Sequence, residues 1–376
     1  MASSAAVARF KLKKGLEFVT NEEPIAYQFF IPGFMSDKLR LYLYPYTNFG
    51  RYEGANSYID RLKETLDIPF RVINERTDRG MVHLLRSLPR TDIVYFNWIE
   101  DLADKRYGYL QILLLAVILV YCRIAGKQVV WFVHNNTSHS RTHWAGKRFT
   151  AWMMRRFANT VLAHAEEARA TAQRHVAVFD HPVADFSPVP DLAPRWDLLL
   201  WGSVSPYKGV LEFVRLHAAR PELRELRVLV AGRFSSAELF EAVRAAAHPN
   251  VSIRNEIIPD ADLFQLVAQS RYVLFSYVSP SVLASAALSQ TVAYGKTIIG
   301  PDRGAFRSLA RQGLVHTFRD EDDLCALLMR LRSEPPVDPD ALRSYAERHT
   351  WAHFGAFLQE QLHACRTRPA WRFVLR

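Results

Sequence analysis

Residues 198–210 have the sequence LLLWGSVSPYKGV, and no other segment says more about the fold. An apolar run ends at Trp201, small residues follow from Gly202, and Lys208 and Gly209 precede the next apolar segment. This order predicts a buried strand, a turn and a helix. Glycine lets the backbone approach a phosphate closely, free helix amides bind its oxygens, and lysine adds positive charge. The loop therefore predicts a phosphate-binding site, with a purely structural turn as the alternative.

The spacing within this loop argues against two common classes of nucleotide-binding protein. Residues 202–209 form neither a G-x-G-x-x-G pattern nor a Walker A loop. A dinucleotide oxidoreductase or a P-loop NTPase would carry one of these two patterns. Neither class is therefore favoured for this chain.

Outward from this stretch, strand-like apolar runs alternate with helical stretches along the chain. The expected strands cover residues 39–44, 92–97, 128–134, 160–163, 197–201, 227–231, 272–275 and 297–300. Such alternation is typical of parallel sheets with helices on both faces. Because 376 residues exceed what one hydrophobic core usually holds, two domains are expected.

A turn-rich, proline-containing segment divides the expected strands into two sets. We expect an N-terminal arm over residues 1–37, a first Rossmann-like domain over 38–180, a linker over 181–195, a second domain over 196–345 and a C-terminal helix over 346–376 that crosses back to the first domain. The predicted fold class is thus α/β, with two Rossmann-like domains facing a central cleft. Ligands of open α/β sheets bind at the carboxyl ends of the strands, so the active site is expected in that cleft.

The net charge of +10 points to an anionic partner. No zinc finger or RNP motif occurs, and acids are interspersed with the basic residues. Nucleic acid is therefore not expected as a partner, whereas an anionic membrane surface or a phosphorylated substrate is.

Three widely separated cysteines without a C-x-x-C pair predict neither a disulfide framework nor a structural zinc site. The N-terminus lacks a charged segment followed by an apolar one, so no secretory signal is expected. Together these features favour the cytoplasm.

The apolar run from Ile112 to Cys122 is shorter than the about 20 residues that a membrane-spanning helix needs. It predicts a buried helix of the first sheet, with a membrane-dipping helix as the alternative.

The segment from Trp144 to Ala158 predicts a helix with an apolar and a basic side. At about 100° per residue, the apolar residues that share a face are Phe149, Trp152, Met153 and Phe157. The basic residues are Lys147, Arg148 and Arg155, with Arg156 at the edge of the apolar face. Such a helix suits an anionic membrane surface. An ordinary domain helix with a solvated basic side is the alternative.

The loop at 202–209 resembles the first strand and loop of the donor-binding domain of GT-B glycosyltransferases. Residues 228–233, 270–279 and 293–304 resemble later elements of that domain in the same order, the last being similar to the family pattern A-x-G-x-P-V-I…G. The donor-binding residues that this resemblance implies are Gly202, Ser203, Lys208, Arg233, Tyr277, Ser279, Ser285 and Ala286.

The chain departs from the GT-B pattern at one position pair. Many retaining members carry two glutamates eight positions apart, but Val282 and Gln290 stand there in this sequence. The segment around Ser285 instead resembles bacterial exopolysaccharide glycosyltransferases, including β-mannosyltransferases. This departure favours an inverting mechanism.

In the first half, residues 131–139 resemble the V-H-N-x-x-P-H segment of the same exopolysaccharide group. His134 ends a predicted strand, where it can bind a sugar or phosphate or transfer a proton. The resemblance places Asn135 and His139 at the acceptor. A turn-capping role for His134 and Asn135 is the alternative.

The loop over residues 46–56 contains glycines that suit a close approach to a ligand, and Gly50 and Arg51 are predicted to bind the acceptor. An inverting transferase needs a general base, and Glu53 in this loop is the first candidate. Glu100 and Asp101, which follow a predicted strand, come next. A loop salt bridge is the alternative for each.

These features predict a glycosyltransferase that uses a GDP- or UDP-linked sugar as substrate, with no cofactor and no metal ion. The expected acceptor is a lipid-linked saccharide or other glycan, and the expected location is the inner face of the plasma membrane, peripherally attached. A sugar-nucleotide epimerase of the same fold and a non-catalytic membrane or nucleic-acid binding protein are the alternatives.

Overall fold

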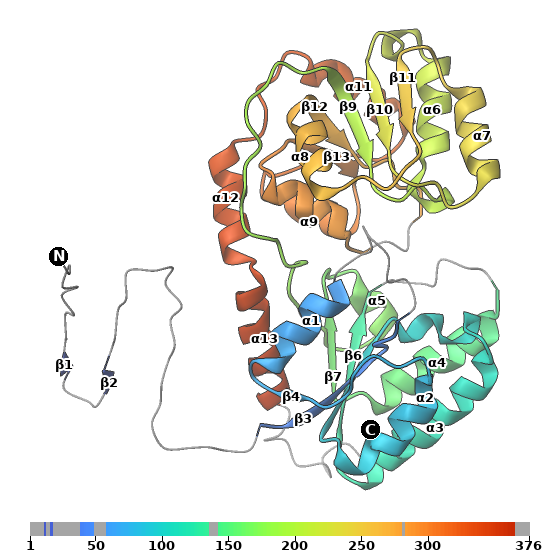
Figure 1. Ribbon diagram of the computed structural model, residues 1–376, viewed down its shortest axis with the longest axis vertical. Coiled ribbons are helices and arrows are strands. Elements are labelled where there is room, and N and C mark those ends of the chain that lie inside the picture. Colours follow the sequence, from blue (N-terminus) through green and yellow to red (C-terminus); the bar gives the residue numbers. More distant parts are fainter. Residues whose placement is uncertain are drawn as a thin grey trace, which may run out of the picture. The chain divides into compact units, whose positions relative to one another are not determined.

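The computed structural model of the chain describes residues 11–12, 16–17, 38–48, 58–134, 142–279 and 283–364. It contains two sheets of six strands each, with helices on their faces (Figure 1). A separate short pairing joins β1 (Lys11–Leu12) antiparallel to β2 (Leu16–Glu17). The α/β class predicted from the sequence is confirmed.

The first sheet has the strand order β4-β3-β5-β6-β7-β8, and all its neighbours pair in parallel. Its strands are β3 (Arg40–Tyr44), β4 (Arg71–Val72), β5 (Ile93–Asn97), β6 (Gln128–Val133), β7 (Thr160–Ala163) and β8 (Ala177–Val178). Its helices are α1 (Tyr58–Asp67), α2 (Gly80–Ser87), α3 (Gly108–Ile124), α4 (Trp144–Phe157) and α5 (Ala168–Ala172), with the 3-10 turns η1 (Leu88–Arg90) and η2 (Ile99–Asp104).

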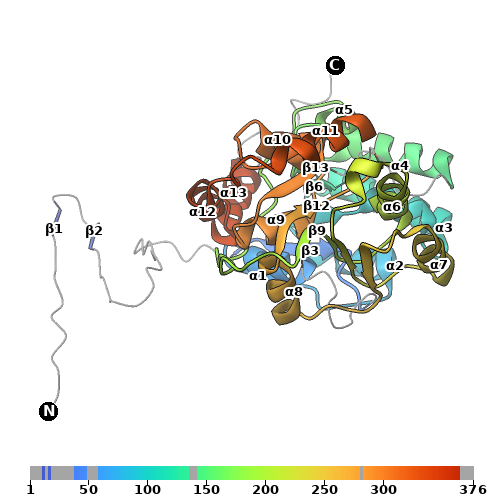
Figure 2. The same cartoon turned by 90° about the horizontal axis from the view of Figure 1, so that it is seen from above.

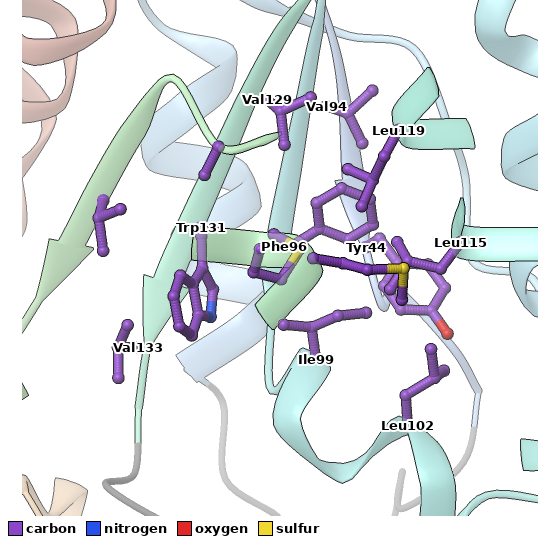
Figure 3. Packing of buried hydrophobic residues seen from close by; sticks show 14 of the residues in the cluster. Tyr44, Val94, Phe96, Ile99, Leu102, Leu115, Leu119, Val129, Trp131 and Val133 are labelled. Atoms are coloured by element: carbon purple, nitrogen blue, oxygen red, sulfur yellow. The ribbon is translucent and has the colours of Figure 1, made fainter. Parts of the chain in front are cut away.

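Successive side chains of the first sheet point to opposite faces, as the pleat of a strand requires. Tyr42 and Phe96 face a core that α2, α3 and α4 complete. Figure 3 shows this core, with Phe96 near Leu115 and Leu119 of α3. Leu43 and its neighbours on the opposite face pack with α1 and α13 (Trp351–Ala364). The sheet therefore has an apolar core on each side, as predicted for a parallel sheet.

The second sheet has the strand order β11-β10-β9-β12-β13-β14, also parallel throughout. Its strands are β9 (Trp196–Trp201), β10 (Val228–Ala231), β11 (Val251–Arg254), β12 (Ser270–Leu274), β13 (Ile298–Pro301) and β14 (His316–Phe318). Its helices are α6 (Val210–Ala219), α7 (Ala237–Ala246), α8 (Asp260–Ala268), α9 (Ala286–Ala293), α10 (Gly304–Ala310), α11 (Glu321–Leu331) and α12 (Pro339–Arg348), with the 3-10 turns η3 (Pro206–Lys208) and η4 (Pro221–Leu223).

Two cores flank the second sheet as well. The core that contains Leu199 packs against α8, α9, α10 and α12, and the core that contains Leu200 packs against α6, α7 and α11. Figure 2 shows α9 and α6 on different sides of strands β9 and β12. The last helix, α13, buries Phe354, Leu358 and Leu362 in the core of the first sheet.

Two helices of the first half differ from their predicted environment. The structure buries one face of α3, including Leu115 and Cys122, but leaves Leu113 62% and Ile124 82% exposed. The helix is thus only half-covered, although its sequence is apolar all round. None of the described helices is long and apolar enough to cross a bilayer.

The prediction that the apolar and basic residues of α4 lie on different sides of the helix is wrong in part. Met153 is buried, but Phe149 and Trp152 are 48% and 53% exposed, on the same outer side as the exposed Arg148 and Arg156. The reason is that the core accepts only a narrow arc of this helix, which Gly146, Thr150, Met153 and Met154 occupy.

Candidate functional site

The two sheets position the candidate site residues at the carboxyl ends of their strands. In the second sheet, β9 pairs with β10 on one side and with β12 on the other. The connections leave β9 and β12 in opposite directions at this point, which is where open α/β sheets bind ligands. A small pocket lies there, and its polar lining comes from the ends of these two strands: Gly202, Ser203, Lys208, Ser276 and Tyr277.

Two glycines leave main-chain atoms at this pocket uncovered by side chains. Gly202 adopts a φ of +95°, and a Cβ atom on Gly232 would lie only 2.0 Å from the carbonyl oxygen of Gly202. Only glycine fits at position 232, because the ends of β9 and β10 approach each other backbone to backbone. The loop after β9 therefore offers main-chain groups to a ligand without side chains in the way.

Lys208 is the charged group of the pocket. Its Nζ lies 3.3 Å from Ser203 Oγ and 5.9 Å from the centre of the Tyr277 ring. Ser276 donates a hydrogen bond from Oγ to the Lys208 carbonyl at 2.9 Å and so holds the turn in place. Burial lowers the pKa of Lys208 to about 8. Among the described residues no carboxylate forms an ion pair with this lysine, so an anionic ligand would supply the missing countercharge.

The predicted residues around α9 form a hydrogen-bonded support for the pocket. The hydroxyl groups of Tyr277 and Ser285 lie 3.0 Å apart. Ser285 also caps α9, its Oγ accepting from the Leu288 amide at 3.4 Å. Ala286 is the first residue of that helix, and the amide of Ser279 donates to the Tyr207 carbonyl at 3.3 Å. Burial raises the pKa of Tyr277 well above its usual range, so its phenol stays neutral.

Arg233 lies apart from the lysine pocket. It is exposed at the end of β10 and lines a neighbouring open hollow of about 510 Å³ together with Phe234, Asn255 and Glu256. Asn255 accepts from the Phe234 amide at 3.0 Å, which fixes this loop. Phosphate contacts from Lys208 and Arg233 therefore require a ligand that extends along the carboxyl edge from β9 to β10.

Gln290 stands where many retaining members have a glutamate. Its side chain makes a hydrogen bond to a residue one helical turn later. Its Nε2 donates to Tyr294 Oη at 2.9 Å. Val282 lies outside the described residues.

In the first half, His134 directly follows β6 and is half-buried. Its Nε2 lies 2.9 Å from Asn97 Oδ1, and its ring stacks on Trp98 with centroids 4.3 Å apart. Because Asn97 Oδ1 can only accept, Nε2 carries the proton and Nδ1 is the basic nitrogen. Burial, with a smaller effect from His181, holds the pKa of His134 well below its usual range, so the ring is neutral near pH 7.

Sequence reasoning missed a cluster of rings around His134. Tyr58 of α1 lies at its centre, with ring centroids 5.3 Å from His134, 5.6 Å from His164 and 5.3 Å from His181. His164 Nδ1 donates to the Phe179 carbonyl at 2.8 Å, so its Nε2 accepts from the Tyr58 hydroxyl at 2.9 Å. His164 follows strand β7 directly, and this position at a strand end was the signal available in the sequence.

Of the candidate general bases, Glu100 and Asp101 lie in η2 just after β5. Glu100 is 9% exposed, and its Oε1 accepts from the His134 amide at 3.3 Å. The structure therefore brings Glu100 and His134 together at one edge of the first sheet. The other predicted residues of this half lie outside the described residues: Glu53, Gly50, Arg51, Asn135 and His139.

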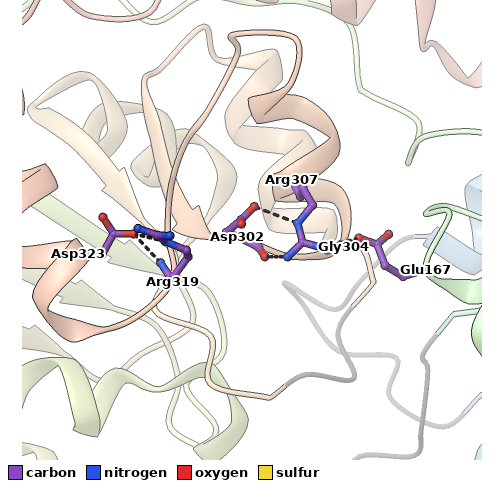
Figure 4. Close-up of polar contacts among 6 residues, drawn as sticks. All are labelled: Glu167, Asp302, Gly304, Arg307, Arg319 and Asp323. Carbon is purple, nitrogen blue, oxygen red and sulfur yellow. Dashed lines mark hydrogen bonds and ion pairs between the residues drawn. The ribbon is translucent and has the colours of Figure 1, made fainter.

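Several contacts join residues of the two halves of the chain near these strand ends. Glu167, between β7 and α5, accepts from the Gly304 amide at 3.2 Å, and its Oε1 lies 3.9 Å from Arg307 Nη1. Arg307 also bonds Asp302, its Nε to Oδ1 at 3.0 Å (Figure 4). The hydroxyl of Ser289 in α9 lies 3.0 Å from His181 Nδ1.

Comparison with known proteins identifies the fold. No protein-family model matches the chain. A search of curated proteins also finds no match. Among solved structures, the Anabaena protein HepE (Alr3699), solved with UDP-glucose, is 16% identical with a TM-score of 0.60, over 87% of this chain and 100% of that chain.

Two further solved structures have the same architecture. Sucrose-phosphate synthase from Thermosynechococcus elongatus is 13% identical with a TM-score of 0.59, over 87% of this chain and 100% of that chain. AviGT4, a glycosyltransferase involved in avilamycin A biosynthesis, is 14% identical with a TM-score of 0.56, over 88% and 99%. The chain therefore has the GT-B glycosyltransferase fold, as the sequence resemblance implied.

Proposed function

We propose that this chain is a glycosyltransferase that moves a sugar from a uridine- or guanosine-diphosphate donor to a lipid-linked saccharide or another glycan acceptor. The observation that carries the proposal is Lys208, a half-buried cation in a pocket where β9 and β12 diverge. The complex of HepE with UDP-glucose shows that a protein of this fold holds such a donor. A diphosphate is the ligand chemistry that matches the lysine, the glycine backbone and the neighbouring Arg233.

The donor half of the reaction follows from these groups. Transfer breaks the bond between the anomeric carbon and the diphosphate oxygen, and the nucleoside diphosphate leaves with the electron pair. Lys208 and main-chain amides of the loop after β9 stabilise the charge that builds on it. We therefore propose that no metal ion is needed, and that Arg233 contributes where the ligand extends past β10.

The acceptor half needs a group that removes the proton from the attacking hydroxyl. In the inverting mechanism that we propose, Glu53 is the first candidate for this base and Glu100 the second. His134, neutral with a basic Nδ1, would accept a hydrogen bond from a sugar hydroxyl. Asn135, His139, Gly50 and Arg51 are proposed to hold the acceptor. The proposed place of the reaction is the cytoplasmic face of the plasma membrane, in polysaccharide or glycoconjugate biosynthesis.

Thermal stabilisation by nucleotides tests the donor site. We expect uridine or guanosine diphosphate, or their sugars, to raise the melting temperature of the purified chain, because a ligand that binds the native state stabilises it. Lys208→Ala should abolish the shift. A half-buried lysine at the opposite edge of the same sheet, Lys296, supplies the matched control, and Lys296→Ala should keep the shift.

Absence of a shift with every nucleotide would contradict the proposal and favour a binding protein with this fold. Product analysis on the preferred donor, with and without a lipid-linked acceptor, then identifies the reaction. Release of nucleoside diphosphate together with a glycosylated acceptor supports transfer. Conversion of the donor sugar without an acceptor would instead identify an epimerase.

A further inference from the structure

Helix α3 presents an apolar stripe to solvent. The large apolar side chains along its outer side are Leu110, Leu113, Val117, Val120, Tyr121 and Ile124, each at least 38% exposed. They recur at intervals of three and four residues, so they form one continuous face. At about 1.5 Å per residue the stripe is roughly 21 Å long. The inner side of α3 is already filled by the core of the first sheet, so nothing within the described part of the chain covers the outer side.

Helix α4 extends this stripe with aromatic side chains. Gly146 of α4 lies against α3, because a Cβ atom there would be 3.1 Å from Ile112 Cδ1. Phe149 follows one helical turn later on a similar side of α4 and stacks on Trp152, with ring centroids 5.5 Å apart. Trp144, 65% exposed, lies at the start of α4. We name the α3 stripe together with these three exposed aromatic residues the α3–α4 surface.

The charges around the α3–α4 surface have one sign. Helices α2, α3 and α4 contain no aspartate or glutamate. Arg148 and Arg156 of α4 are exposed beside the aromatic residues, and the Arg148 guanidinium lies 5.5 Å from the Trp144 ring. A neighbouring acid, Asp104, is paired with Lys147 at 2.6 Å. The surface is therefore apolar and aromatic in the middle and positive at its edge.

We propose that the α3–α4 surface is a docking site for an anionic lipid bilayer. A bilayer interface receives apolar side chains, favours tryptophan and tyrosine at its boundary, and attracts arginine through anionic headgroups. Pairing of two copies through this surface would instead bring positive edges together, which is unfavourable in a two-fold contact. Charge complementarity thus selects the anionic bilayer over a second copy of the chain.

The surface is also placed to serve the proposed reaction, and only this step rests on the proposed function. Helices α3 and α4 are the next α-helices after β5 and β6, so each begins on the side of the carboxyl edge of the sheet, where His134 and Glu100 lie. Trp144 and Leu110 therefore mark the end of the surface that is nearer to the candidate acceptor site. A lipid-linked acceptor held in the same membrane would present its sugar at that edge.

Flotation of the full-length protein with lipid vesicles tests the docking site. We expect binding to phosphatidylcholine vesicles that contain phosphatidylglycerol, and weaker binding to phosphatidylcholine alone. The double variant Leu113→Gln and Val117→Gln should lower partitioning at least about tenfold, because two exposed apolar side chains no longer enter the bilayer. Arg148→Glu with Arg156→Glu should lower binding to the anionic vesicles by at least about fivefold for each arginine replaced.

The matched control is Ile68→Gln, which replaces an apolar residue that is 73% exposed just beyond α1, away from α3 and α4. It should leave vesicle binding unchanged. Binding that none of the α3–α4 variants reduces would overturn the proposal, as would a dimer in sedimentation that Leu113→Gln and Val117→Gln dissociate. Because nucleotide-induced stabilisation is measured without vesicles, its persistence in all these variants separates failure of the docking site from failure of the proposed function.

Discussion

Lys208 is the charged residue of the proposed donor pocket. Its ammonium group has a serine hydroxyl and an aromatic ring as neighbours instead of a carboxylate, and burial lowers its pKa to about 8. A lysine with that pKa is charged near neutral pH but loses its proton in mildly alkaline solution. The diphosphate binding that we propose for Lys208 should therefore depend on pH within an accessible range.

We predict that the dissociation constant for the preferred nucleoside diphosphate is nearly constant below pH 7.5 and rises about tenfold from pH 7 to pH 9, because only the protonated amine attracts the diphosphate. Calorimetric titration at several pH values measures this. The variant Lys208→Arg keeps its charge throughout, so its affinity should be flat over the same range. An identical pH profile in the two proteins would show that another group controls binding.

At the residue scale, the part of the candidate site that was predictable is the part formed by local sequence. Gly202, Ser203 and Lys208 lie within one strand–turn segment, and the structure places all three in one pocket. The contact between Tyr58 and His164 joins residues that are 106 positions apart. The position of His164 at a strand end is visible in the sequence, but only the topology of the first sheet brings it against Tyr58, so no local pattern indicates their contact.

At the scale of elements, the eight predicted strands are all present with boundaries within two residues. Within the two six-stranded sheets, the strands that were not predicted are β4, β8, β11 and β14. β4 and β8 have two residues each, β11 has four residues and β14 has three. β11 and β14 lie at the two edges of the second sheet. An edge strand is covered on fewer sides, so it lacks the continuous apolar run that marks a central one. The exposed stripe of α3 could not be predicted because the helix has too many apolar residues. A helix that is apolar all round does not indicate which of its sides the core covers.

Helix α13 packs one apolar face into the core of the first sheet. Phe354, Leu358 and Leu362 recur every four residues and are fully buried against α1 and the first sheet. We predict that Leu358→Ala lowers the free energy of unfolding by about 3 kcal/mol, because it removes buried methyl groups and leaves a cavity. Denaturant unfolding followed by circular dichroism measures the loss.

Gln359 is exposed on the same turn of α13, so Gln359→Ala is the control and should change stability by less than about 0.5 kcal/mol. A small effect of Leu358→Ala, equal to that of the control, would mean that α13 does not contribute to the core of the first sheet.

At the scale of the whole molecule, the ring cluster around Tyr58 combines distant parts of the chain. His134 and His164 follow neighbouring strands of the first sheet, and His181 bonds Ser289 of α9 in the second half. Tyr58 of α1 also contacts Trp351 of α13, with ring centroids 5.5 Å apart. The rings of all three histidines pack against Tyr58, so protonation of any one of them places a charge in the middle of these contacts.

The fold is therefore expected to be sensitive to mild acid. Burial lowers the pKa of His181 to about 4 and holds those of His134 and His164 well below the usual range. In the unfolded chain each histidine titrates near pH 6.5, so below that pH the unfolded state binds more protons than the folded state. Stability is complete above about pH 6.5 and is lost as the pH falls toward 4, and His181 alone contributes a loss of about 2 kcal/mol at pH 5.

Urea unfolding at pH 7 and pH 5 tests this prediction, with the His181→Gln variant beside the unaltered chain. A glutamine does not titrate, so the variant should lose about 2 kcal/mol less between the two pH values, whatever its stability at pH 7. His353→Gln, which replaces an exposed histidine of α13, should lose as much as the unaltered chain. Equal losses in all three proteins would mean that His181 takes up its proton in the folded state, and that the cluster tolerates a charge at the point where the two halves of the chain meet.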